Sequence, residues 1–175
     1  KTENYDTYYW YKKDNTKEAF KKISFYKYFE PFNIAIGTGD YVEDYEAELK
    51  EKILNKIKKV KFSDTGFIYV YNTNGTNLAH INKDLIGINK LDIQDKDGKC
   101  SVKDIIEFAQ KNKKGFISHF ASYKPNSEIK SRKKVSYVKY FKEWNWVIGA
   151  GFYLDKLDKE ISDKKITAIT SNKEA

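Results

Sequence analysis

Aromatic and aliphatic residues fall in short runs along the first part of the chain, separated by charged and turn-forming residues. Residues 5–11 read YDTYYWY, and the segments 22–29 and 33–39 are also rich in Phe, Tyr and Ile. Short runs of this composition are typical of β-strands. The pattern therefore predicts three strands. Pro31 falls in the turn between the last two, where its missing N–H does least harm.

A helical period replaces this pattern at Tyr41. From there to Lys61, apolar residues recur at spacings of three and four and form one stripe, made of Tyr45, Leu49, Ile53, Ile57 and Val60. Such spacing places them on one face of an α-helix. Lys and Glu fill the other positions, some of them four residues apart, which supports a helix with a solvated outer face.

The rest of the chain alternates between strand and helix patterns. Residues 67–72 predict a strand, and the dipeptide Asn74-Gly75 predicts a tight turn into a returning strand at 77–80. Residues 81–100 have no clear period and predict loop and short turns. The other predicted elements are an amphipathic helix at 102–111 with Ile105, Ile106 and Phe108 buried, strands at 115–121, 133–142 and 144–152, and an amphipathic helix at 154–169.

This order of elements indicates an α+β fold. Neighbouring strands joined by short turns predict an antiparallel sheet, here of five strands, with a long helix before it and another after it. The long helix would cover one face and the middle segment the other, as in modules of PAS type. A small ligand would bind in a cavity between the sheet and the middle segment.

The chain also repeats itself at an offset of 112 residues. Residues 27–49 read KYFEPFNIAIGTGDYVEDYEAEL, and residues 139–161 read KYFKEWNWVIGAGFYLDKLDKEI. The register continues upstream without a gap. A match of this length in one frame indicates a tandem pair of related modules, of which the first is represented only by its tail.

Four segments carry a family resemblance, because they occur in a family-like order and spacing. They are GFIYVYNTNGTNLAH (66–80), DLIGINKLDIQDKDGK (84–99), KKVSYVKYF (133–141) and WNWVIGAGFYLDKLDKEI (144–161). Together they resemble the double Cache sensor domains of bacterial chemoreceptors and sensor kinases. The resemblance covers nearly the whole chain and implies a PAS-like fold.

The resemblance also implies a division of the chain into four parts. Residues 1–40 would be the C-terminal strands of a truncated membrane-distal Cache module, and residues 41–62 the linking helix. Residues 63–153 would form the membrane-proximal PAS-like Cache module. Residues 154–175 would be the output helix toward the membrane.

The function that the resemblance implies is that of a sensor. The domain would be periplasmic, in a chemoreceptor of the cell inner membrane held by transmembrane helices outside this sequence. It would bind a small organic acid or amino acid and signal in chemotaxis, as a homodimer in the full receptor, with no enzyme activity and no cofactor. The alternative is a membrane histidine kinase, since only the cytoplasmic half would distinguish the two.

A carboxylate ligand needs charge-assisted hydrogen-bond donors in a partly dry cavity. Donors on the segments expected to line the cavity are Tyr69, Tyr71, His80, His119, Lys134 and Tyr137. The resemblance favours His80, Lys134 and Tyr137, which lie in the LAH and KVSYV motifs. In a regular strand Lys134 and Tyr137 point to opposite faces, so both line one cavity only at a bulge or a strand edge.

Other interpretations of these residues stay open. Lys134 could be a surface lysine, and the two histidines could be structural. Tyr69 and Tyr71 could belong to the sheet core. The sequence also departs from the family pattern, because His80 is followed by Ile81 in place of Pro, and because His119 and Ala121 stand at positions that are usually aromatic.

The composition argues against other functions. The net charge of +8 comes almost entirely from lysines that are spread along the chain and interleaved with acids, with Arg132 the single arginine. Nucleic-acid sites favour arginine forks, so a solvated surface is favoured over a basic nucleic-acid-binding protein, which remains a remote alternative. The aromatic share of 16% can form a core that a disordered chain lacks.

No catalytic, metal or phosphate site is predicted. Cys100, His80 and His119 are too few for a zinc cluster, and no nucleophile–base arrangement is recognisable. The glycine pairs at 37–39 and 149–151 lack the third glycine of a phosphate loop and sit at strand ends, where close strand packing explains them. No apolar run approaches the roughly 20 residues of a membrane span.

Overall fold

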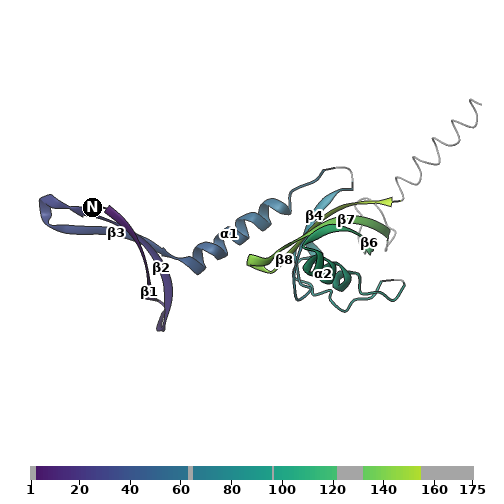
Figure 1. Cartoon of the computed structure of the whole chain (residues 1–175), viewed down its shortest axis with the longest axis horizontal. Coiled ribbons are helices and arrows are strands. Elements are labelled where there is room, and N and C mark those ends of the chain that lie inside the picture. Colours follow the sequence, from purple (N-terminus) through teal and green to yellow (C-terminus); the bar gives the residue numbers. More distant parts are fainter. Residues whose placement is uncertain (1–2, 63–64, 96, 122–131, 155–175) are drawn as a thin grey trace, which may run out of the picture. The chain divides into compact units, whose positions relative to one another are not determined.

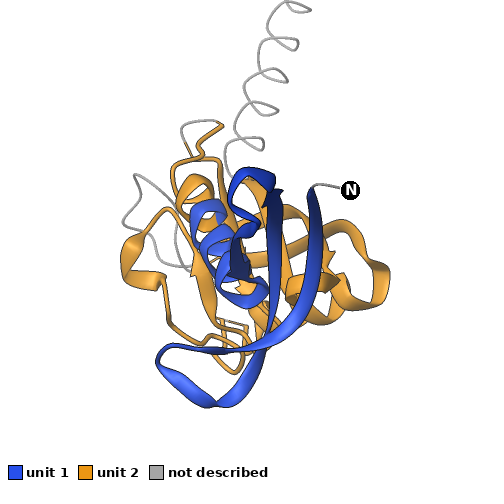
Figure 2. Ribbon diagram, turned by 90° about the vertical axis from the view of Figure 1, so that its left-hand side faces the viewer, with its two compact units in different colours: residues 1–53 blue, residues 54–175 orange. Residues whose placement is uncertain are grey.

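The computed structural model of the chain describes residues 3–62, 65–95, 97–121 and 132–154. They belong to two compact units, residues 1–53 and 54–175, which Figure 2 colours separately. Helix α1 (Val42–Ile57) runs across this division. It lies within the predicted range of 41–61, and Val60 lies beyond its end.

The first unit contains a three-stranded antiparallel sheet in the order β1-β2-β3. All three predicted strands are confirmed, but the second is much longer than its aromatic run. β1 and β2 form one long hairpin, because pairing begins beside the turn, between Lys12 and Asn15, and continues to Glu3 and Lys27. A short 3-10 helix (Glu30–Phe32) joins β2 to β3. The strands are β1 (Glu3–Lys12), β2 (Asn15–Phe29) and β3 (Ile34–Tyr41).

The second unit contains the predicted five-stranded antiparallel sheet, in the order β5-β4-β8-β7-β6 (Figure 1). The first and last strands in this sheet's sequence order, β4 and β8, are neighbours and pair antiparallel, with β8 at the centre of the sheet. The strands are β4 (Phe67–Asn72), β5 (Asn77–Ala79), β6 (Lys114–Ala121), β7 (Arg132–Phe141) and β8 (Trp146–Tyr153). The fold is therefore the α+β class that the order of elements predicted.

Helix α2 (Ser101–Asn112) packs on one face of this sheet, where Figure 1 shows it beneath the strands. Ile105 and Ile106 are buried as predicted, and Phe108 is half-buried against the same core. Between β5 and α2 the chain forms the predicted irregular segment, with one 3-10 turn (Lys83–Leu85). The helix predicted at 154–169 and the loop around Pro125 lie outside the described residues, apart from Leu154.

Candidate functional site

Three aromatic side chains of β4 form the floor of the candidate site. Phe67, Tyr69 and Tyr71 alternate along the strand and are all buried on the face that α2 covers. The rings of Tyr69 and Tyr71 lie 5.6 Å apart in an edge-to-face arrangement. Gly149 on the neighbouring strand makes room for them, because a Cβ atom at that position would overlap the ring of Tyr69. The glycine predicted to allow close packing therefore accommodates a ring of the site.

Lys134 on β7 is buried in this aromatic surface. Its side chain is 1% exposed, and its Nζ lies 3.9 Å from the centroid of the Phe67 ring, 5.2 Å from Tyr69 and 5.1 Å from Tyr153. No ion pair joins it to a carboxylate of the described residues. Burial lowers the pKa of Lys134 to about 7, because water no longer solvates the ammonium. The three rings supply only cation–π attraction in compensation.

The two predicted histidines line the same cavity and are held by hydrogen bonds. The backbone N–H of Asn82 donates to Nδ1 of His80 at 3.0 Å. His119 pairs with Lys134 across β6 and β7, and its Nε2 lies 3.0 Å from the hydroxyl of Ser136. Its Nδ1 lies 3.3 Å from the carbonyl oxygen of Phe120, which can only accept. That contact makes Nδ1–H the donor and leaves Nε2 to accept from Ser136.

Both histidines are neutral at physiological pH. Burial lowers the pKa of His80 to about 4, and the charges of Lys134 and Lys90 act in the same direction. Burial also lowers the pKa of His119 to about 4, with a further contribution from Lys134. The cavity thus places uncharged imidazoles beside a cation, and neither ring neutralises that cation.

The tyrosine hydroxyls complete the polar groups of the floor. Burial raises the pKa of Tyr69 well above its usual value and that of Tyr71 to about 12, so both stay protonated. The hydroxyl of Tyr69 is buried and makes no hydrogen bond of good geometry with the described residues, although the neighbouring hydroxyl of Ser136 partly offsets the rise in its pKa. Such a group is costly unless something binds to it. The hydroxyl of Tyr69 therefore remains available to a ligand near Lys134, whose Nζ lies 5.2 Å from the Tyr69 ring.

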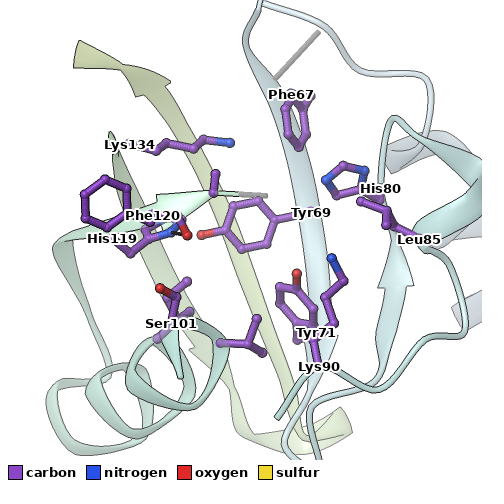
Figure 3. A pocket seen from close by; sticks show the side chains of 13 residues that line it. Phe67, Tyr69, Tyr71, His80, Leu85, Lys90, Ser101, His119, Phe120 and Lys134 are labelled. Carbon is purple, nitrogen blue, oxygen red and sulfur yellow. Dashed lines mark hydrogen bonds between the residues drawn. The ribbon is translucent and has the colours of Figure 1, made fainter. Parts of the chain in front are cut away.

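These side chains enclose a cavity of about 50 Å³. In Figure 3, Tyr69 and Tyr71 stand between two groups, one around Lys134 and His119 and the other around His80, Leu85 and Lys90. No acidic side chain of the described residues lines it. The lining residues are Phe67, Tyr69, Tyr71, His80, Leu85, Lys90, Ser101, Val102, Ile105, His119, Phe120, Ala121 and Lys134.

A second, larger hollow of about 260 Å³ adjoins this cavity and is called the outer hollow below. Ser101, His119 and Phe120 line both. The outer hollow also carries Asp95, Asp104, Lys99, Lys133 and Ser118. Acidic groups thus occur in the outer hollow and not around the inner cavity.

The structure brings five of the six sequence-predicted site residues together and separates the sixth. Tyr137 lies on the opposite face of the sheet from Lys134, is 39% exposed and packs against Phe116 at a ring distance of 5.1 Å. β7 pairs in unbroken register with both of its neighbours, so the regular alternation of a strand keeps the two side chains apart. Neither the bulge nor the edge position that would unite them is present.

Sequence reasoning did not find several residues of the site. Phe67 could have been found, because it continues the alternation of Tyr69 and Tyr71. Tyr153 could have been found as the β8 position that pairs with Lys134. Lys90 lies in the irregular segment, so no period of the sequence indicated that its side chain is buried against the cavity.

Two absences concern the described residues only. They contain no group of three or more His, Cys, Asp or Glu side chains placed to hold a metal ion. None of their helices combines the length and the apolar character needed to cross a bilayer.

The chain is similar to known sensor domains. A family model described as a Cache domain matches residues 1–158. A structure of a methyl-accepting chemotaxis protein from Vibrio parahaemolyticus is 28% identical, with a TM-score of 0.55 over 63% of this chain and 73% of that one. A Cache chemosensory domain studied for carboxylic acid recognition is 24% identical and has the same fold, with a TM-score of 0.57 over 62% of this chain and 73% of that one.

A curated protein gives a similar result. The sensor histidine kinase MctS of Rhizobium johnstonii is 28% identical over 107 residues, which are 61% of this chain and 23% of the kinase. The chain therefore spans less than a quarter of the length of that relative.

Proposed function

The chain belongs to the Cache domain family, and from this premise we propose that it is the extracytoplasmic ligand-binding domain of a bacterial chemoreceptor. The observation that carries the proposal is the buried ammonium of Lys134, which has no carboxylate partner among the described residues. A buried charge is costly unless it is paired. An anionic ligand would pair it, and Tyr69 would donate a further hydrogen bond to that ligand.

The ligand is a small organic acid or an amino acid. Its carboxylate would lie between Lys134 and the hydroxyl of Tyr69. Tyr71, His80 and His119 would form the surrounding wall. The matched structure studied for carboxylic acid recognition supports this class of ligand. Tyr137 has no part in the proposed site, because it faces away from the cavity.

The similarity to the kinase MctS supports a second candidate function, in which the chain is the sensor domain of a membrane histidine kinase. Both candidates assign the same task to this domain, which is to bind a ligand and transmit its presence across the inner membrane without catalysis. The cytoplasmic half of the parent protein distinguishes them, since it carries either a methyl-accepting signalling region or a kinase.

We also propose the division of the chain that its repeat suggests. Residues 1–40 belong to a membrane-distal module, 41–62 link it to a membrane-proximal module at 63–153, and 154–175 carry the output toward the membrane. The 112-residue repeat supports two related modules. In the full receptor the domain would form a homodimer.

The test is a thermal-shift screen of the chain against short organic acids and amino acids at pH 7. A ligand at about 100 times its dissociation constant should stabilise the fold by about 2.7 kcal/mol. We expect Lys134→Met to lose that shift, and Lys139→Met to keep it. Lys139 is a matched control, because it lies on the same strand and is exposed. A shift that survives Lys134→Met would refute the assigned site.

A further inference from the structure

The end of β8 lies against the buried lysine. We propose that Tyr153, the last residue of this strand, couples the state of the Lys134 ammonium to the point where the chain leaves the sheet. Tyr153 is then a positioning residue, which acts on the following residues through the end of the strand. The inference goes beyond ligand binding, and only the statement that a ligand sets the state of the ammonium rests on the proposed function.

Tyr153 contacts Lys134 directly. The two residues are register partners on β8 and β7, and the Nζ of Lys134 lies 5.1 Å from the centroid of the Tyr153 ring. Tyr153 is 3% exposed, but it is not among the residues that line the inner cavity, whereas Lys134 is. The lysine side chain therefore belongs both to the cavity and to the contact at the strand end.

The backbone changes conformation immediately after this contact. β8 ends at Tyr153, and Leu154 already has helical backbone geometry. Protein interiors are close-packed, so a buried ring does not shift without the backbone that carries it. The contact between Lys134 and the Tyr153 ring therefore also determines the position from which Leu154 starts.

The first unit contains the same junction. Lys22 and Tyr41 are register partners on β2 and β3, and the Nζ of Lys22 lies 5.2 Å from the Tyr41 ring. Helix α1 begins at the next residue, Val42. A lysine, a tyrosine and the start of a helix thus meet twice in the chain, at equivalent positions of the repeat. This recurrence supports a role of the contact in joining strand to helix.

Further contacts fasten the junction of the first unit. The hydroxyl of Tyr41 donates to the carbonyl oxygen of Tyr11 at 2.6 Å. Lys12 forms an ion pair with Asp44 in the first turn of α1, and its Nζ lies 5.2 Å from the Tyr41 ring. The start of α1 is therefore held by several contacts besides the one with Lys22.

The junction of the second unit depends on a desolvated ammonium. Lys134 is 1% exposed, whereas Lys22 is half-buried. Attraction between an ammonium and a ring strengthens when water is excluded. It is lost when the lysine gives up its proton, and it weakens when an anion draws the Nζ away. Burial lowers the pKa of Lys134 to about 7, so the change of protonation occurs near neutral pH.

The neighbouring groups leave this change of protonation distinct. The pKa values of His80 and His119 are about 4, and that of Tyr69 is raised well above its usual value. None of these three groups titrates between pH 5.5 and 8.5. Burial also lowers the pKa of Lys90, so Lys90 needs a control. Helix α2 contributes no titratable side chain to the cavity wall, where its residues are Ser101, Val102 and Ile105. The titratable groups of the described residues that face Lys134 are Tyr69, His80, His119 and Tyr153.

The test observes Lys134 and Leu154 separately by NMR. The 175-residue chain is labelled with ¹³C at lysine Cε and at leucine methyl groups and titrated from pH 5.5 to 8.5. We expect the methyl signals of Leu154 to titrate with the same midpoint as Cε of Lys134. Lys134→Met should abolish the titration of Leu154, and Lys90→Met should keep it. A Leu154 signal that does not titrate in the unmodified chain, or that still titrates in Lys134→Met, would overturn the proposal.

Variants of Tyr153 test the path between the two signals. In Tyr153→Leu, Cε of Lys134 should still titrate and Leu154 should not, because the ring is gone. In Tyr153→Phe, which keeps the ring, both should titrate. Phe152→Leu is the matched control, since Phe152 is the preceding residue and is 47% exposed, and both signals should titrate there as well.

Several results would contradict this path. The inference is wrong if Leu154 still follows Lys134 in Tyr153→Leu, or if Leu154 stops titrating in Tyr153→Phe. Should Tyr153→Leu fail to fold, Tyr153→Phe and Lys134→Met decide the question together. The titration needs no ligand, whereas the proposed function is judged by the thermal-shift screen, so the failure of one is distinguishable from the failure of the other.

Discussion

The two sheets of the molecule contain the same local structure but differ in burial. In the first unit the hydroxyl of Tyr28 donates to Asn33 at 2.8 Å, and in the second the hydroxyl of Tyr140 donates to Asn145 at 2.9 Å. Both asparagines have φ of 53° and follow a 3-10 turn. The repeated residues therefore form the same turn twice, 112 positions apart.

The similarity extends to the surroundings of Lys134. The Nζ of Lys22 lies 5.2 Å from the ring of Tyr41, as Lys134 lies 5.1 Å from that of Tyr153. The hydroxyl of Ser24 bonds to Tyr8 at 2.9 Å, as Ser136 bonds to His119 at 3.0 Å. In each unit the residue that bonds to the serine also pairs directly with the lysine across the two strands. Tyr8 pairs with Lys22, and His119 pairs with Lys134.

The two lysines differ in how deeply they are buried. Lys22 is half-buried, and large side chains of the first sheet such as Tyr9 are mostly exposed. Lys134 is almost fully buried, because rings of two other strands of its own sheet, β4 and β8, surround its Nζ and α2 packs on the same sheet. The comparison shows that repeated local sequence reproduces strand contacts. The desolvation that gives a lysine unusual chemistry comes from the additional strands and the helix.

The largest expected effect comes from removing the buried charge. Lys134→Met should abolish the response to ligand and stabilise the free chain by about 1–4 kcal/mol, because an unpaired buried ammonium is replaced by an apolar side chain of similar size. Lys22→Met should keep the ligand response and change stability by less than about 0.5 kcal/mol. Urea denaturation with and without ligand measures both. Equal effects at the two lysines would remove the distinction between the units.

Gly149 and Gly37, which occupy equivalent positions of the repeat, test the same difference in packing. Gly149→Ala should destabilise the second unit by about 1–3 kcal/mol, because the new methyl group overlaps the ring of Tyr69. Gly37→Ala at the repeated position should cost less than about 1 kcal/mol, because the nearest atoms to its Cβ would be the carbonyl oxygen of Phe25 at 3.3 Å and Cβ of Tyr26 at 3.4 Å. Hydrogen exchange of the strand amides reports each unit separately. A larger loss at Gly37 would contradict the packing described.

At mildly basic pH, the pH dependence of stability should come mainly from Lys134 of the second unit. The pKa of Lys134 is about 7 in the fold and about 10.4 in the unfolded chain. The unfolded state therefore binds more protons between these values, and stability rises with pH there. From pH 7.5 to pH 9, above the range in which His80 and His119 contribute, the gain from Lys134 should be about 2 kcal/mol, and Lys134→Met should remove it. A gain that persists in the variant would point to another group.

Ligand binding should show the opposite trend with pH. A carboxylate pairs with the ammonium form of Lys134, so the affinity should fall as pH rises above about 7. Binding above that pH should also take up a proton, which calorimetry in buffers of different ionisation enthalpy detects. Affinity that rises with pH would contradict the role of Lys134.

The smallest difference between the two units should occur at the turn that both contain. Asn33→Ala and Asn145→Ala each place alanine at positive φ and remove the acceptor of a tyrosine hydroxyl, at a cost of about 1–2 kcal/mol. We expect the two costs to agree within about 0.5 kcal/mol, as measured by hydrogen exchange in each unit. A clear difference between them would show that burial also determines the turn.

Features of the fold that depend on neighbouring residues could be predicted from the sequence, and features that depend on distant parts of the chain could not. The strands and α2 were predictable, because alternation and helical period depend on neighbours along the chain. The alternation also made the separation of Lys134 and Tyr137 foreseeable. The long extension of β2 back to Asn15 was not, because its polar residues form strand by pairing with β1 and not by their own propensity.

The amino-acid sequence by itself determined the α+β class, the five strands of the second unit, the repeat and the family, since these depend on periodicity and motif order. Only the tertiary structure decided which donors share a cavity and what charge each carries. Lys90 is brought to the wall by an aperiodic segment, and Lys134 is desolvated by Phe67, Tyr69 and Tyr153. Burial depends on what packs across the sheet from distant parts of the chain, and no local pattern contains that information.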